Sequence, residues 1–304
     1  MSYLSRRKGI LLAGGQGKRL APLTNSFSKQ VMPVYDKPMI YYSLTTLMLC
    51  GIKNILIITE SNNVELYQRL LGDGGKWGIQ LSYAIQKKPD GVAQSVLIGE
   101  KFIGDKPVAI ALGDNIFHGN DFINLLQSAD SSKIGGTVFA YPVSDPENYG
   151  VLNFNNTGSV VGIEEKPIKP LSQYAVTGLY FYDNTVVERA KELDFSSRGE
   201  LEISELNKKY LNDELLNVKI MGRGIAWLDT GTIDSLQEAS EYIRTLEHRQ
   251  GLKIGCPEEV AWRQGWINDE ALEELAGNLI NSSYGKYLMK LLELKKTDSF
   301  FSIN

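Results

Sequence analysis

The sequence has 304 residues, of which 43% are hydrophobic, and a formal net charge of -4 at neutral pH. This length supports a full buried core, so we expect one large α/β domain with or without an appendage. The acidic balance argues against nucleic acid as a partner, because such binding depends on many phosphate-facing cations. The apolar run after Arg6 and Arg7 is too short for a signal peptide or a membrane span, which predicts a cytoplasmic protein without a membrane partner.

The few cysteines and histidines exclude further classes of site. Cys50 and Cys256 lack metal-ligand spacing and are expected to be free thiols in a reducing compartment. His118 and His248 lie in unrelated contexts. The sequence therefore argues against a zinc site and against a histidine-based nucleophile.

The chain opens with an apolar strand, residues 10–13, that runs into a glycine-rich turn and a basic segment. The relevant residues are Gly14, Gly15, Gly17, Lys18, Arg19 and Lys29. Glycines let backbone N–H groups approach phosphate oxygens, and the cations balance their charge. The sequence matches neither a Walker loop nor a dinucleotide-binding fingerprint. Leu12 stands where the first needs glycine, and Leu20 stands where the second needs glycine or alanine. We therefore predict a different polyphosphate site, with a tight turn and solvated basic residues as the alternative.

Strands and helices then alternate over about a hundred residues. Helices are expected over 38–50, 62–71 and 91–102, and strands over 54–59, 79–85 and 107–112. Such alternation implies right-handed βαβ units and a Rossmann-like, mostly parallel sheet with helices on both faces. Ligands of such sheets bind beyond the carboxyl ends of the strands.

Between residues 135 and 183 the pattern changes to short Val-, Tyr- and Phe-rich runs, which predicts a smaller antiparallel insertion with a hairpin at 155–158. Helices are expected over 184–193, 202–211 and 232–248, and strands over 218–221 and 225–228. Three short helical segments follow residue 256. We place the boundary near 250, which gives an α/β domain of residues 1–250 and a C-terminal helical segment of residues 251–304 that packs on that domain or on a neighbouring subunit.

Two aspartates follow apolar strands, Asp114 in VAIALGDN and Asp229 in IAWLDTGT. Carboxylates at two strand ends that face one crevice could hold Mg²⁺, which prefers oxygen ligands and commonly keeps substrate phosphates in its shell. Alternatively, each aspartate caps the next helix or turn. Beside a polyphosphate site we favour the metal, because a nucleoside triphosphate without a cation would leave its charge unbalanced.

Two further clusters carry polar side chains that could bind a ligand. In EEKP, Lys166 could hold a monophosphate and Glu165 could accept hydrogen bonds from sugar hydroxyls, although a charged strand end has the same composition. In IQKKPDG, the Gln86 amide could pair with a pyrimidine edge and Gly91 permits close approach, although without the other motifs a plain loop leading into a helix is favoured.

At this point the chain resembles the sugar-phosphate nucleotidylyltransferases. Their signature of LAGG, G-x-R-L-x-P and K-Q-x-x-P appears at residues 12–15, 17–22 and 29–33. The later motifs YDKPMIYY, YAIQKKPDGVAQ, LGDNIFHG, ENYGVL, EEKPIKP, YAVTGLYFYD, RGELEI, GRGIAWLDTGT and KIGCPEEVAWRQGWI follow the order of the bacterial glucose-1-phosphate thymidylyltransferases within that family. The resemblance runs from Gly9 to Leu292 and implies a fold of the nucleotide-diphospho-sugar transferase type.

The resemblance also implies roles for individual residues. Arg19 and Lys29 would contact the triphosphate and stabilise the transition state, and Asp114 and Asp229 would bind Mg²⁺. The nucleotide would be bound by Leu12, Gly14, Gly15, Gly17, Gln30, Gln86, Pro89 and Gly91. Glucose 1-phosphate would be held by Tyr149, Gly150, Glu165, Lys166 and Val176. A second, regulatory nucleotide site between subunits would include Arg223, Lys253, Glu259 and Arg263, for which a surface helix with ordinary charges is the alternative.

The implied reaction joins dTTP and glucose 1-phosphate to give dTDP-glucose and pyrophosphate, the first step of dTDP-sugar synthesis, for example toward dTDP-rhamnose. The family resemblance also suggests a homotetramer. Two alternatives remain open: a uridylyltransferase acting on the same sugar phosphate, and a silent module that senses nucleotide sugars.

Overall fold

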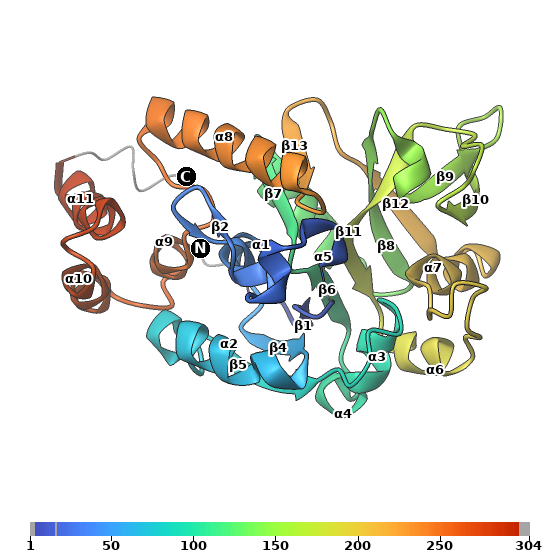
Figure 1. The fold of residues 1–304 in the computed structure, drawn as a ribbon, viewed down its shortest axis with the longest axis horizontal. Helices are drawn as coiled ribbons and strands as arrows, with labels where there is room; N and C mark the ends of the chain where they lie inside the picture. The colour runs from blue at the N-terminus through green and yellow to red at the C-terminus, as the bar shows by residue number, and fades with distance from the viewer. Residues whose placement is uncertain (1–3, 16, 298–304) are drawn as a thin grey trace.

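One mixed sheet forms the centre of the molecule in the computed structural model, which describes residues 4–15 and 17–297 (Figure 1). Its parallel part consists of β5 (Gln80–Ile85), β4 (Asn54–Thr59), β1 (Lys8–Leu12) and β6 (Val108–Leu112), in that order. β1 pairs in parallel with both β4 and β6. This central position buries β1 on both faces, which explains its continuous apolar sequence.

The remaining strands extend the same sheet beyond β6. β11 (Tyr174–Tyr182) runs antiparallel to β6 and also pairs with β8 (Gly136–Pro142) and β9 (Gly150–Phe154). β10 (Val160–Glu165) forms the expected hairpin with β9, and β12 (Leu216–Ile220) lies parallel to β8. The Asn155 side chain stabilises the hairpin turn by accepting hydrogen bonds from the N–H groups of Thr157 and Ser159, at 3.0 and 2.9 Å. The predicted α/β class with an antiparallel insertion is thus confirmed.

Helices cover both faces of the sheet, and the alternation of side chains along β1 shows how. Leu11 and Ala13 belong to a buried cluster with residues of α1 (Met39–Leu49), α2 (Val64–Leu71), α5 (Phe122–Asp130) and α9 (Pro257–Arg263). Ile10 and Leu12 belong to the opposite cluster, which includes residues of α3 (Gln94–Ile98), α4 (Glu100–Ile103), α6 (Val186–Lys191) and α7 (Ile203–Asn212). Burial on both faces thus fixes the layered architecture.

Two local features differ from the prediction. The helix expected over 91–102 is divided into α3 and α4 at Gly99, where an added Cβ would lie 2.8 Å from Ile10 Cδ1. In addition, β7 (Asn115–Gly119), which was not predicted, pairs with β13 (Ile225–Asp229) in a separate two-stranded antiparallel sheet. Asp229 therefore ends a strand outside the central sheet, whereas Asp114 follows the parallel strand β6.

The segment before α1 contains short turns and a small hairpin. Three 3₁₀ turns, Lys18–Leu20, Leu23–Asn25 and Lys29–Val31, precede β2 (Pro33–Val34) and β3 (Lys37–Pro38). Further 3₁₀ turns occupy Ser61–Asn63, Gly75–Trp77 and Pro146–Asn148. The short turns arrange Arg19 and Lys29 on loop backbone close to the carboxyl end of β1.

The C-terminal helices lie at one end of the molecule (Figure 1). α8 (Ile233–Gln250) begins with a capping box between Thr232 and Ser235 and ends at Gly251, which has a φ of 70°. α9 packs on the main domain, and the indole Nε1 of Trp77 donates a hydrogen bond of 3.1 Å to Glu258. α10 (Asp269–Asn278) and α11 (Ser283–Thr297) share a further apolar cluster. No helix in the described ranges has the length and apolar character needed to span a membrane.

Candidate active site

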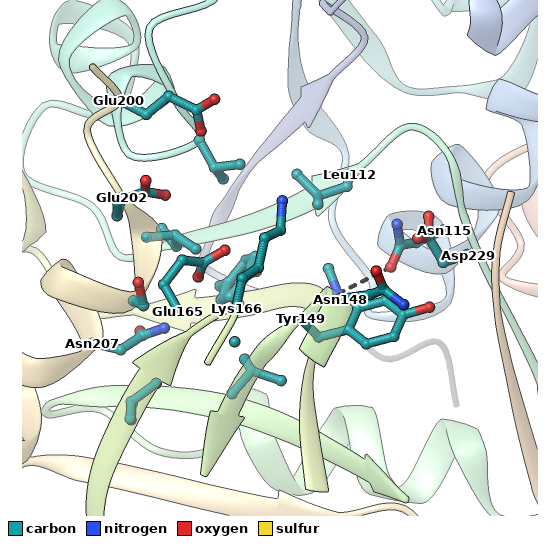
Figure 2. Close-up of a pocket in the computed structure, with 18 of the residues that line it drawn as sticks. Leu112, Asn115, Asn148, Tyr149, Glu165, Lys166, Glu200, Glu202, Asn207 and Asp229 are labelled. Carbon is teal, nitrogen blue, oxygen red and sulfur yellow. Dashed lines mark hydrogen bonds between the residues drawn. The ribbon is translucent and has the colours of Figure 1, made fainter. Parts of the chain in front are cut away.

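A cavity of about 210 Å³ lies where the parallel part of the sheet meets the antiparallel insertion (Figure 2). Its walls come from the ends of β6, β9, β10, β11 and β13, from α7, and from the loops beside them. Eight of the predicted site residues line it: Arg19, Asp114, Tyr149, Gly150, Glu165, Lys166, Val176 and Asp229. Segments far apart in the chain therefore contribute to one cavity.

The register of the β7–β13 pair places the two aspartates together. Asp229 lies opposite Asn115, the residue after Asp114. The backbone N–H and the hydroxyl of Thr230 both donate hydrogen bonds to the carbonyl oxygen of Asp114, at 3.2 and 2.8 Å. The proximity expected from two strand ends thus arises from the antiparallel pairing of β7 with β13, which was not predicted.

The Asp114 carboxylate is held in its charged form by Lys29. Burial alone would raise the pKa of Asp114, but the adjacent Lys29 ammonium, which forms an ion pair with Oδ2, lowers it below its usual value. The Nδ2 of Asn115 also donates a hydrogen bond of 2.9 Å to Oδ1. Lys29 itself is buried, so its charge acts where water screens it little.

Asp229 shows the opposite shift. Burial, together with the neighbouring charge of Asp114, raises the pKa of Asp229 to about 6, although Lys29, Arg19 and Lys166 oppose the shift. Within the described residues the Asp229 side chain accepts no hydrogen bond. Two adjacent half-buried carboxylates with too little compensating positive charge suit a divalent cation.

The donor set fits a metal that keeps much of its shell for other ligands. Across the part of the chain that the structure describes, no group of three or more His, Cys, Asp or Glu side chains is arranged to hold a metal. A hard cation held by Asp114 and Asp229 would have phosphate oxygens and water to complete its coordination. Sites that act on phosphates commonly have this composition.

Arg19 approaches the same carboxylates from the opening loop. An added Cβ on Gly231 would lie 2.7 Å from Nη2 of Arg19 and 3.2 Å from Oδ2 of Asp229. The glycine therefore leaves space for the guanidinium beside the acidic pair. Gly15 and Gly17 have φ values of 102° and 54°, conformations that glycine adopts without strain.

The predicted nucleotide residues lie next to the opening loop, outside the set that lines the cavity. Nε2 of Gln30 donates a hydrogen bond of 3.2 Å to the carbonyl oxygen of Gly14. Gln86 also contacts Gly14, where an added Cβ would lie 2.3 Å from its Oε1. Leu12 is buried at the end of β1, and Pro89 is exposed. The structure thus groups Gly14, Gln30 and Gln86.

Gly91 has a structural explanation. An added Cβ would lie 2.3 Å from the carbonyl oxygen of Leu201, and the φ of Gly91 is 105°. This glycine therefore allows the backbone at Leu201 to approach closely. Its contact with a nucleotide stays a prediction.

The predicted sugar-phosphate residues line the same cavity, with Tyr149 beside Asp229 and with Glu165 and Lys166 farther from it (Figure 2). The backbone N–H of Lys166 donates a hydrogen bond of 2.9 Å to the carbonyl oxygen of Tyr149, and Lys166 has a φ of 44°. That conformation is costly for a lysine and directs its side chain into the cavity. Burial and the charge of Asp229 raise the pKa of Tyr149 to about 12, so its hydroxyl stays protonated.

Several lining residues were not predicted: Asn115, Arg198, Glu200, Glu202, Ser204, Asn207 and Trp227. Ser204 Oγ and Asn207 Nδ2 are buried and have no hydrogen-bond partner among the described residues. Buried groups of this kind are normally satisfied, so both are suited to a ligand hydroxyl. Most of these residues lie in or beside LGDN, RGELEI and AWLD, which contained the signal that could have identified them.

The four possible regulatory residues lie outside the cavity. Lys253 forms ion pairs with Asp36 and Glu247, the latter at 3.0 Å. Glu259 and Arg263 pair within α9 at 2.8 Å. Arg223 lies on an exposed turn between β12 and β13. A second nucleotide site at these residues stays a prediction, and Lys253 already has internal partners.

Comparisons with a family model and with known proteins point to the same family. The model of the nucleotidyl transferase family matches residues 8–245. A glucose-1-phosphate thymidylyltransferase of Neisseria meningitidis is 56% identical over 94% of this chain and 99% of its own length. One from Mycobacterium tuberculosis is 54% identical over 94% of this chain and 99% of its own length.

Solved structures share the fold. A Bacillus anthracis protein provisionally named glucose-1-phosphate thymidylyltransferase, solved with sucrose, has a TM-score of 0.73 and 41% identity, and the alignment covers 78% of this chain and 95% of that one. A UDP-glucose pyrophosphorylase solved with UDP-glucose has a TM-score of 0.68 at 24% identity, which supports the fold alone; the alignment covers 79% of this chain and 99% of that one. With a family model that matches most of its length and relatives that align along nearly all of it, the chain belongs to the nucleotidyl transferase family and, within it, to the glucose-1-phosphate thymidylyltransferases.

Proposed function

We propose that the protein transfers the thymidylyl group of dTTP to α-D-glucose 1-phosphate, which gives dTDP-glucose and pyrophosphate. The observation that carries this proposal is a single cavity lined by two half-buried carboxylates, with the cations Arg19, Lys29 and Lys166 near them and polar groups beyond them. The relatives named above carry the name of this reaction. We further propose that the reaction is the first step of dTDP-sugar synthesis, in the cytoplasm and by a homotetramer.

The chemistry follows from the charges. An oxygen of glucose 1-phosphate attacks the α-phosphorus of dTTP, a new P–O bond forms, and the bond to the bridging oxygen breaks as pyrophosphate leaves. The sugar phosphate is already ionised, so no protein base is needed. The main barrier is repulsion between two polyanions, which positioned cations reduce. Arg19 and Lys29 neutralise the triphosphate, and Lys166 holds the sugar phosphate.

The other groups of the cavity would orient the reactants. Glu165 accepts hydrogen bonds from sugar hydroxyls, and Tyr149, Gly150 and Val176 complete the sugar site. Mg²⁺ held between Asp114 and Asp229 would supply further positive charge to the phosphates. Leu12, Gly14, Gln30 and Gln86 would contact the base and deoxyribose beside the loop.

A single assay tests the proposal: pyrophosphate release with glucose 1-phosphate and either dTTP or UTP, with and without Mg²⁺. We expect kcat/KM for dTTP to exceed that for UTP, and the thymine methyl group should account for about 10- to 200-fold of this preference, because one methyl group in an apolar pocket contributes about 1–3 kcal/mol. A preference for UTP would identify a uridylyltransferase. Absence of release with every nucleotide would favour a sensing module.

A further inference from the structure

Asn115 is the best-connected residue of the cavity that the proposed mechanism does not use. It follows Asp114 at the start of β7 and is 3% exposed. Its Oδ1 accepts hydrogen bonds from the backbone N–H of Gly178 at 3.0 Å and from Nε1 of Trp227 at 2.6 Å. Its Nδ2 donates to Oδ1 of Asp114 at 2.9 Å.

These contacts fix the orientation of the amide. Both the Gly178 N–H and the Trp227 indole N–H can only donate, so the atom that they share must be the amide oxygen. The NH₂ group then has to face Asp114. Rotation of the amide by 180° would leave two buried donors without an acceptor and would turn the amide oxygen toward a carboxylate.

Two other features hold the arrangement in place. An added Cβ on Gly178 would lie 2.5 Å from Oδ1 of Asn115, so only glycine allows the backbone to approach. The Trp227 ring packs edge-on against Tyr141 and Tyr149, at centroid distances of 5.9 and 5.1 Å. The indole donor is thus held by aromatic packing that reaches the predicted sugar site.

The result is that each oxygen of the Asp114 carboxylate has one donor. Lys29 pairs with Oδ2 and Asn115 with Oδ1. A carboxylate held at both oxygens has a fixed plane, and each oxygen keeps lone-pair capacity for a cation. Hydrogen bonds of this kind to a metal-binding group orient it and tune its affinity.

We propose that Asn115, oriented by Trp227 and Gly178, is a positioning residue that presents Asp114 to the divalent metal. The proposal rests on the proposed function only in taking Asp114 as a metal ligand. It predicts that Trp227 acts on metal binding through Asn115, over and above any contact of its ring with the sugar.

The experiment measures binding of Mn²⁺ alone, a spectroscopic substitute for Mg²⁺, by electron paramagnetic resonance. The variants are Asn115→Ala, Trp227→Phe and the double variant, with folding checked by circular dichroism. Trp227→Phe keeps an aromatic ring but removes the N–H. Trp262→Phe is the matched control, because its Nε1 donates a 2.7 Å hydrogen bond to Asp269 among the C-terminal helices.

We expect Asn115→Ala to raise the Mn²⁺ dissociation constant by about 10- to 100-fold, the usual effect of losing an outer-shell partner. Trp227→Phe should raise it less, and the double variant should bind no more weakly than Asn115→Ala, because the two residues act in series. The Trp262→Phe control should bind as the wild type does.

Wild-type Mn²⁺ affinity in folded Asn115→Ala, or additive effects of the two substitutions, would overturn the proposal. If Asn115→Ala fails to fold, Trp227→Phe decides alone, and unchanged affinity in that variant overturns it. Pyrophosphate release by the wild type is measured in parallel. Its absence, with the metal effects intact, would refute the proposed function and leave this inference standing.

Discussion

Lys29 is the buried cation that the Asp114 carboxylate faces, and its removal tests the charge argument at the scale of one residue. We expect Lys29→Ala to lower kcat by about 10²- to 10³-fold, equivalent to about 2.7–4 kcal/mol for one preorganised charge-stabilising donor. Steady-state pyrophosphate release measures the loss. Lys106→Ala, which removes a surface cation paired with Asp105, is the control. Near-normal turnover of Lys29→Ala would remove this residue from the catalytic set.

Asp183 gives a pH-dependent prediction beside the sheet. Burial alone would raise its pKa, but hydrogen bonds from Thr185, Gly135 and Tyr210 lower the pKa below the ordinary value. A carboxyl with a lowered folded pKa stabilises the protein above its unfolded pKa of about 3.9, and this stabilisation is lost as pH falls through the folded value.

Asp183→Asn should therefore be less stable than the wild type at pH 7, by about 1.5–3 kcal/mol for hydrogen bonds to a charged group. The difference should shrink below about pH 4. Urea unfolding at several pH values measures it. A difference that stays constant from neutral to acidic pH would contradict the assignment.

Single residues also show where the sequence was sufficient. The sequence alone predicted that Asp114 and Asp229 lie close together, because each follows an apolar run that reads as a strand and stops at a carboxylate. The contact between Asn115 and Trp227 could not be predicted, because their hydrogen bond depends on the register of β7 with β13. The sequence NIFHG has too few residues to show a strand period.

At the scale of elements, α8 follows closely after β13, the strand that ends at Asp229, and depends on its N-cap. The hydroxyl of Thr232 accepts a hydrogen bond from the backbone N–H of Ser235. The hydroxyl of Ser235 in turn accepts one from the backbone N–H of Thr232. We expect Thr232→Ala to cost about 1 kcal/mol of stability, because first-turn donors lose their acceptor. Thr232→Asp, which can still cap, is the control in chemical unfolding. Equal stability of the two variants would show that the cap contributes nothing.

Element boundaries were predicted well where local signals dominate and poorly where tertiary contacts decide. The strand expected over 54–59 is a continuous apolar run, and it appears as β4. The helix expected over 38–50 has a clear stop at Gly51, and it appears as α1. The helix over 91–102 is interrupted at Gly99, which packs closely on Ile10 of β1. That contact joins residues about ninety positions apart and leaves no local pattern in the sequence.

At the scale of the whole molecule, the C-terminal helices attach through a few buried polar contacts. Glu258 is 4% exposed and accepts hydrogen bonds from Trp77 Nε1 and from the Tyr284 hydroxyl. We expect Trp77→Phe to destabilise the protein by about 1–3 kcal/mol, because a buried carboxylate loses a donor.

Thermal unfolding measures this loss. Trp266→Phe is the control, because the Trp266 indole nitrogen makes no hydrogen bond with any described residue. A melting temperature of Trp77→Phe equal to that of the control would show that the hydrogen bond to Glu258 does not help to hold α9.

The site is assembled from both ends of the α/β domain, and this has a consequence for synthesis on the ribosome. Arg19 and Lys29 emerge early, Asp114 follows after much of the sheet, and Asp229 comes only just before α8. β1 also waits for its second neighbour, β6, before it can be enclosed. A nascent chain released before Asp229 would therefore carry its phosphate-facing cations with only one of the two carboxylates, and an incomplete translation product would be inert.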